Sequence, residues 1–147
     1  MTEKLNDTEV KVNIVTFGLD DNPFELELMR LAFEKAGITD FQLFDNVEKF
    51  WFSYYDDVHV AVLDYDLKPQ SGLDIAEKLL SKNPFCKIII YSGIEDHKAI
   101  AKALNMGIYK WIGKNEINSL QRAIDCVVKA KQDVLPFVLF QKSINSK

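Results

Sequence analysis

The sequence is poor in cysteine and holds only two among its 147 residues, Cys86 and Cys126. These two residues are far apart in the chain and lack the paired spacing of a zinc site, which argues against a structural metal centre built on thiolates. Both lie in apolar surroundings, so we expect reduced thiols rather than a disulfide. Such cysteine usage is typical of a cytoplasmic protein.

Long apolar runs and basic clusters are also missing. No apolar stretch approaches the ~18 residues that a membrane span requires, and the polar start MTEKLNDTEVK does not resemble a signal peptide. The 18 lysines and arginines are dispersed and the net charge is -4, whereas binding to duplex nucleic acid needs a basic face. We therefore expect neither a membrane protein nor one that binds nucleic acid directly.

The apolar residues that are present, 48% of the chain, suffice for one domain with a real core. Short apolar runs alternate with helical periodicity. They predict strands over 11–19, 41–44, 58–63, 86–92 and 108–112, and helices over 22–37, 46–55, 71–83, 96–107 and 116–132. In the first helix we expect Phe24, Leu28, Leu31 and Phe33 to face the core. Five strand–helix units predict an α/β fold, a parallel sheet with helices on both faces.

Polar side chains follow four of the predicted strands. In a parallel sheet of this kind the functional groups gather at the carboxyl ends of the strands, so we expect these side chains to converge. They are Asp20 and Asp21 after the first strand, Asp64 and Asp66 after the third, Ser92 at the end of the fourth, where Gly93 follows it, and Lys114 after the fifth.

The residue types at this rim favour phosphoryl chemistry. Clustered carboxylates repel one another unless a cation joins them, and a few hard oxygen ligands suit Mg²⁺. Asp64 is then the best-placed nucleophile for a phosphoryl group. Lys114 would pair with the phosphate as a point charge, Ser92 would donate a hydrogen bond to it, and Gly93 would leave an approach path.

Each of these residues alone has a simpler interpretation. Asp20 or Asp21 could cap a helix, Ser92 and Gly93 could form an ordinary turn, Lys114 could lie on the surface, and the Asp66 side chain could be a solvated loop carboxylate. Their occurrence together, in this order, is what favours a functional site.

Four segments of the chain resemble the receiver domain of two-component response regulators. They are GLDDNP, VLDYDLKPQSGLD, IIIYSG and GIYKWIGK, and the resemblance extends over residues 11–131. It implies a flavodoxin-like (βα)5 doubly wound parallel sheet with strand order 2-1-3-4-5.

The resemblance also implies residue roles. Asp64 would accept a phosphoryl group from a sensor histidine kinase or a histidine phosphotransfer protein. Mg²⁺ would be held by Asp20, Asp21, Asp64 and the backbone carbonyl of Asp66. Ser92 would be the switch hydroxyl, Lys114 the phosphate partner and Trp111 the switch aromatic. Phosphorylation would then alter contacts with an unknown downstream protein, so the chain would be a signalling switch and not an enzyme.

The chain departs from the family pattern after the fifth strand. Asn115 follows Lys114 where the family usually has proline, so the usual cis peptide is not expected there. Trp111 replaces the usual Tyr or Phe and needs more room to turn inward.

Two other interpretations compete with this one. A haloacid-dehalogenase-like phosphatase also carries an apolar strand ending in D-x-D, with Asp64 as nucleophile and Asp66 as general acid. That family places D-x-D first and an acidic pair late, whereas here the acidic pair comes first. A receiver-like module that is never phosphorylated would lack an essential group, and this chain lacks none.

The chain divides into a lead over residues 1–10, a receiver domain over 11–131 and an extension over 132–147. The extension is too short for an output domain, so we expect a stand-alone receiver. It is also apolar, with Val134, Leu135, Phe137, Val138, Leu139 and Phe140. We expect it to pack back on the domain; the alternative is a contact in a homodimer or with a partner.

Overall fold

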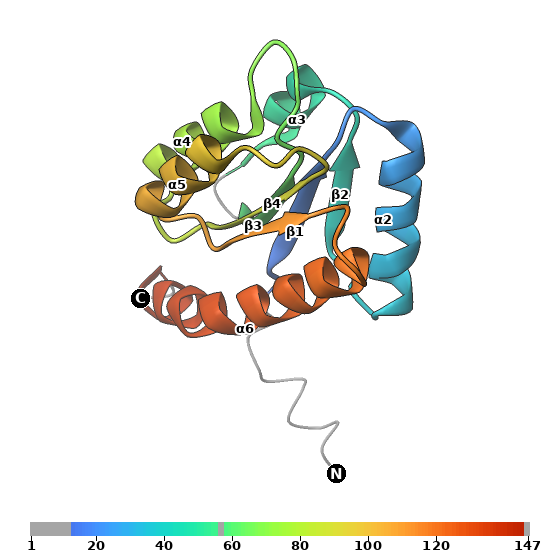
Figure 1. Cartoon of the computed structure of the whole chain (residues 1–147). Coiled ribbons are helices and arrows are strands. Elements are labelled where there is room, and N and C mark those ends of the chain that lie inside the picture. Colours follow the sequence, from blue (N-terminus) through green and yellow to red (C-terminus); the bar gives the residue numbers. More distant parts are fainter. Residues whose placement is uncertain (1–12, 56–57, 146–147) are drawn as a thin grey trace.

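The structure, a computed structural model, describes residues 13–55 and 58–145, so the predicted lead over 1–10 lies outside the described residues. Five strands and five helices alternate along this part of the chain (Figure 1). In order, they are β1 (Val15–Leu19), α2 (Pro23–Lys35), β2 (Phe41–Phe44), α3 (Val47–Ser53), β3 (Val58–Leu63), α4 (Gly72–Lys82), β4 (Lys87–Ser92), α5 (His97–Met106), β5 (Lys110–Gly113) and α6 (Ser119–Asn145).

The five strands form one parallel sheet in the order β2-β1-β3-β4-β5. Helices α2 and α6 cover one face, while α3, α4 and α5 cover the other (Figure 1). The predicted flavodoxin-like fold is therefore confirmed. All six residues of β3 are buried, because a central strand of such a sheet is covered by helices on both faces.

Side-chain caps set where the helices begin. Asn22 accepts hydrogen bonds from the backbone N–H groups of Phe24 and Glu25 at the start of α2, and Asn46 accepts one from Lys49 at the start of α3. These caps satisfy N–H groups that have no partner within their own helix.

The predicted core face of α2 is wrong in part. Phe24 is 67% exposed and Leu31 is 50% exposed, whereas Met29 and Phe33 are buried. Apolar residues occur on several sides of this helix, so their spacing does not single out one face. Packing decides it: Met29 and Phe33 lie in the same core cluster as residues of the sheet and of α6.

The last helix is much longer than the sequence predicts. It was expected over 116–132, but α6 begins at Ser119 and continues to Asn145, with Pro136 inside it. Proline removes a backbone hydrogen bond from a helix interior, which made a helix end before it the natural expectation. Here the apolar side chains of Val134 and Val138 are buried on the sheet, and their burial offsets that loss.

The part of α6 beyond residue 131 also makes aromatic contacts. The ring of Phe137 stacks on Phe85, with 3.9 Å between ring centroids. The apolar extension is thus packed against the domain, although Leu139 and Phe140 on its other sides are exposed.

The remaining expectations about the chain concern thiols and membranes. Cys86 and Cys126 are both free thiols. Among the described residues, no helix is both long enough and apolar enough to cross a membrane.

We predict that Val134→Ala lowers the free energy of unfolding by about 2 kcal/mol, because it removes a fully buried side chain and leaves a cavity under the sheet. Leu139→Ala, at a 43% exposed position of the same helix, is the control and should change it by less than about 0.5 kcal/mol. Urea denaturation measures both. Equal values for the two variants would contradict the packing of this segment.

Candidate functional site

The carboxyl ends of β1, β3, β4 and β5 meet at one edge of the sheet (Figure 1). The backbone fixes their relative heights: the N–H of Asp64 donates to Leu19 O at 2.9 Å, and that of Lys114 donates to Ser92 O at 2.7 Å. The residues that follow these strands therefore lie around a common centre, as parallel packing requires.

Three carboxylates form the centre of this edge. Asp20, Asp21 and Asp64 each place an oxygen within 4.8 Å of the others, with Asp20 and Asp64 buried and Asp21 exposed. Asn22 provides the cap of α2, so that role does not occupy Asp20 or Asp21. Asp20 does accept a hydrogen bond from the backbone N–H of Asn22 at 2.9 Å, which orients its carboxylate.

The Asp64 carboxyl group has a strongly perturbed acidity. Burial, the largest effect, and the neighbouring charges of Asp20 and Asp21 together raise its pKa to about 6, against the opposing effect of Lys114. Ionising this group therefore costs free energy in the folded protein. A buried carboxylate in such surroundings favours a nearby cation that offsets its charge.

Lys114 supplies a positive charge to the cluster. Its ammonium donates a hydrogen bond to Asp20 Oδ2 at 2.6 Å and lies 3.7 Å from Asp64 Oδ1 and 4.0 Å from Glu25 Oε1. Burial opposes the charge on Lys114, but the hydrogen bond with Asp20 and the nearby carboxylates outweigh it and raise the pKa. The side chain is 14% exposed, so it is held at the site and not in solvent.

A close approach of two segments sets the backbone around Asp64. A Cβ atom at Gly72 would lie 2.2 Å from the carbonyl oxygen of Asp64, so a side chain at this position would displace α4 from the loop. The N–H of Gly72 also donates to Tyr65 O at 2.9 Å. Within this loop Asp66 is exposed, and the bond between Lys68 and Pro69 is cis.

Ser92 lies at the end of β4 with its side chain buried. Its Oγ accepts a hydrogen bond from the backbone N–H of Ile94 at 3.0 Å, which leaves the hydroxyl hydrogen available as a donor. A Cβ atom at Gly93 would meet nothing within 4 Å, so the space beside this residue is open.

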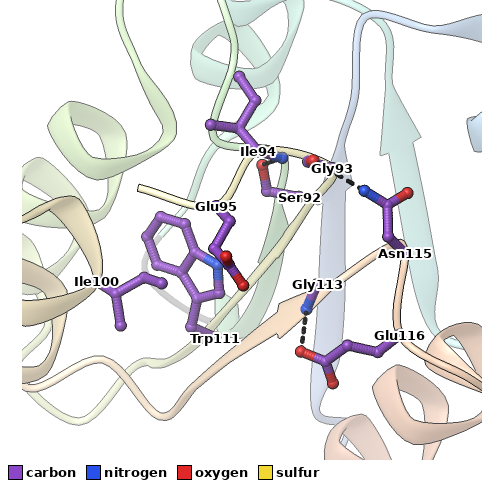
Figure 2. A pocket seen from close by; sticks show the side chains of 9 residues that line it. All are labelled: Ser92, Gly93, Ile94, Glu95, Ile100, Trp111, Gly113, Asn115 and Glu116. Carbon is purple, nitrogen blue, oxygen red and sulfur yellow. Dashed lines mark hydrogen bonds between the residues drawn. The ribbon is translucent and has the colours of Figure 1, made fainter. Parts of the chain in front are cut away.

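A pocket of about 250 Å³ lies between the ends of β4 and β5. Figure 2 shows Trp111 and Ile100 on one side of it and Asn115 and Glu116 on the other. The Trp111 ring also contacts the ring of Tyr65, with 5.3 Å between centroids. Because Tyr65 directly follows Asp64, this contact joins the acidic cluster to the pocket.

Hard oxygen donors make the cluster fit Mg²⁺. The three carboxylates bring several formal negative charges into a small, partly buried space, and the nearby charge of Lys114 balances only part of them. A divalent cation would relieve the repulsion that, in addition to burial, raises the pKa of Asp64.

The structure brings Asp20, Asp21, Asp64 and Lys114 together, and it places Ser92 and Trp111 at the neighbouring strand ends. The side chain of Asp66 stays outside the cluster that the described residues form. Sequence reasoning missed Glu25 and Tyr65. An acidic residue in a first helical turn is usual, and an aromatic residue in a loop carries no signal of its own, so neither could have been found from the sequence.

Comparisons with known proteins agree with this arrangement. The family model described as "Response regulator receiver domain" matches residues 17–125. The transcriptional regulatory protein ComA of Bacillus subtilis is 33% identical over 66 residues, which is 44% of this chain and 29% of ComA. The chain thus matches less than a third of the length of that relative.

Solved structures of other proteins share the fold, among them the following two. A response regulator receiver protein from Pseudomonas putida has a TM-score of 0.70 at 23% identity, covering 82% of this chain and 99% of that one. A response regulator receiver domain protein from Clostridium thermocellum has a TM-score of 0.72 at 17% identity, covering 82% of this chain and 96% of that one.

We predict that Asp64→Asn stabilises the metal-free protein at pH 7.5 by roughly 2 kcal/mol, because it removes a charge that the fold destabilises. The pKa is raised on folding, so the cost of the charge is complete above pH 6 and absent below pH 4. The gain should therefore disappear as the pH falls through this window. Thermal unfolding at several pH values measures it, and a gain independent of pH would contradict the assignment.

Proposed function

Since the chain belongs to the response regulator receiver domain family, we propose that it accepts a phosphoryl group on Asp64 and thereby switches its contacts with other proteins. The observation that carries the proposal is the surroundings of Asp64. This buried carboxylate lies against two other aspartates and has the ammonium of Lys114 3.7 Å away.

The transfer step follows from these groups. An ionised oxygen of Asp64 attacks the phosphorus of a phosphohistidine and forms a P–O bond. The P–N bond breaks, and its electron pair leaves with the imidazole nitrogen of the donor. The product is an acyl phosphate. Lys114 moves from its bond with Asp20 toward the added phosphoryl oxygens, whose charge it stabilises.

Asp20, Asp21 and Asp64 would hold Mg²⁺, with the backbone carbonyl of Asp66 as a further ligand. When bound, the ion would supply positive charge beside the phosphoryl oxygens. The residues themselves orient the site: the backbone N–H of Asn22 orients Asp20, and Gly72 lets α4 approach the backbone of Asp64 closely while its N–H bonds to Tyr65 O.

Ser92 and Trp111 would carry the change to the surface. The Ser92 hydroxyl donates a hydrogen bond to a phosphoryl oxygen and moves toward Asp64. Trp111 then turns into the pocket that lies beside Ser92, and the face formed by α5, β5 and α6 changes shape. A sensor histidine kinase or histidine phosphotransfer protein would be the donor, and a downstream protein would recognise the altered face.

We predict that the protein gains the mass of one phosphoryl group when it is incubated with acetyl phosphate and Mg²⁺. Asp64→Asn should abolish the gain, and so should removal of the metal with a chelator. Asp66→Asn, an identical change in the same loop, is the control. It should retain phosphorylation because the proposed role of Asp66 uses its backbone carbonyl. Intact-protein mass spectrometry measures all four samples.

Two further measurements separate the alternatives. No mass gain with either acetyl phosphate or a phosphorylated histidine donor would favour an interaction module that is never phosphorylated. Many turnovers of a generic phosphate ester per protein molecule would instead favour a phosphatase.

We predict that Lys114→Ala slows phosphorylation by acetyl phosphate at least tenfold, because the added negative charge loses its nearest cation. Lys110→Ala, at an exposed position of the same strand, should change the rate less than twofold. Equal rates for the two variants would show that Lys114 takes no part in the reaction.

A further inference from the structure

The main chain of Lys114 is held from both sides. Its N–H donates to Ser92 O at 2.7 Å, and its carbonyl oxygen accepts a hydrogen bond from Ser119 Oγ at 2.9 Å. The first contact belongs to the pairing of β4 with β5. The second is different, because it joins the end of β5 to the first residue of α6 through a side chain.

Ser119 is itself oriented by a buried partner. Its Oγ lies 3.2 Å from the hydroxyl oxygen of Tyr91, and the two side chains belong to residues that are 9% and 6% exposed. A serine hydroxyl has one hydrogen, and here Lys114 O receives it. Tyr91 must therefore donate to Ser119, so the chain of hydrogen bonds runs from Tyr91 through Ser119 to Lys114.

The ring of Tyr91 also lies near the ammonium group of Lys114. The ammonium nitrogen of Lys114 lies 5.5 Å from the centroid of the Tyr91 ring. A ring face attracts a cation without neutralising it, so this contact limits the motion of the side chain but leaves the charge available. One tyrosine thus touches Lys114 at its ammonium and, through Ser119, at its carbonyl.

A purely structural role for Ser119 would be to cap α6. Among the described residues, however, its hydroxyl bonds to Tyr91 and Lys114 and to none of the N–H groups at the start of that helix. A further hydrogen bond lies nearby: Asn115 Nδ2 donates to Gly93 O at 3.3 Å (Figure 2). The side-chain contacts of Ser119 and Asn115 therefore both hold the segment that carries Lys114.

We propose that Tyr91 and Ser119 are positioning residues that hold Lys114 in place for phosphoryl transfer. A lysine side chain has four rotatable bonds and loses about 2 kcal/mol of rotamer entropy when it is fixed. Ordering it in advance removes that cost from the reaction. The effect on transfer rests on the function proposed above, whereas the effect on the order of the Lys114 side chain does not.

The test compares matched variants of the whole chain. Ser119→Ala and Tyr91→Phe each remove one hydroxyl of the chain of hydrogen bonds. Ser81→Ala removes a hydroxyl that donates to Lys78 O at 2.7 Å, and Tyr109→Phe removes one that donates to Asp133 at 2.6 Å, both away from Lys114. Ser119→Thr, which keeps a hydroxyl, should restore the native behaviour.

The first measurement is the mobility of the Lys114 side chain, by NMR relaxation of its Cε with ¹³C-labelled lysine, assigned with Lys114→Arg. We expect the Lys114 signal to report increased motion in Ser119→Ala and Tyr91→Phe and no change in either control. Unchanged order in both variants would overturn the proposal. The mobility of the Lys114 side chain can be measured whether or not the protein accepts a phosphoryl group.

The second measurement is the rate of phosphorylation by acetyl phosphate with Mg²⁺. We expect Ser119→Ala to lower it three- to tenfold in the native background and less than twofold in the Lys114→Ala background, because the serine acts through the lysine. An equal loss in both backgrounds would mean that Ser119 acts on the fold and not on Lys114. A native protein that is never phosphorylated would refute the proposed function, and the mobility measurement would still decide the positioning role.

Discussion

Repulsion among three carboxylates at one edge of the sheet is the constraint on which the site depends. Asp20, Asp21 and Asp64 lie within 4.8 Å of one another, and burial of Asp64 removes most of the water that would screen its charge. Lys114 relieves part of this repulsion by bonding to Asp20. The site is thus arranged so that added positive charge lowers its electrostatic energy.

The rest of the fold keeps this unfavourable cluster in place. The parallel sheet sets the heights of the strand ends, and Gly72 allows α4 to approach the backbone of Asp64 closely. On the opposite side, Tyr91 and Ser119 hold the main chain of Lys114. Backbone contacts and buried hydroxyl groups therefore hold together charged side chains that repulsion would otherwise move apart.

Helix α6 begins at this edge of the sheet and runs along the face that it covers together with α2. α6 begins at Ser119, beside Lys114, and its far end buries Val134 and Val138. The apolar side chains of the extension pack on the sheet, and because of these contacts the helix continues past Pro136. Ser119, whose hydroxyl bonds to the main chain of Lys114, is consequently part of a well-packed helix and not of an isolated loop.

The order of strands and helices and the acidic and basic residues at the strand ends can be predicted from the amino-acid sequence, because both follow from local periodicity and from the parallel sheet that it implies. The buried face of α2 cannot, since Phe24 and Leu31 are as apolar as Met29 and Phe33, and packing in the folded protein selects it. The tertiary structure also decided that Lys114 bonds to Asp20 with Glu25 nearby, and that α6 continues past Pro136. These features depend on contacts between segments far apart in the chain, and such contacts leave no local pattern.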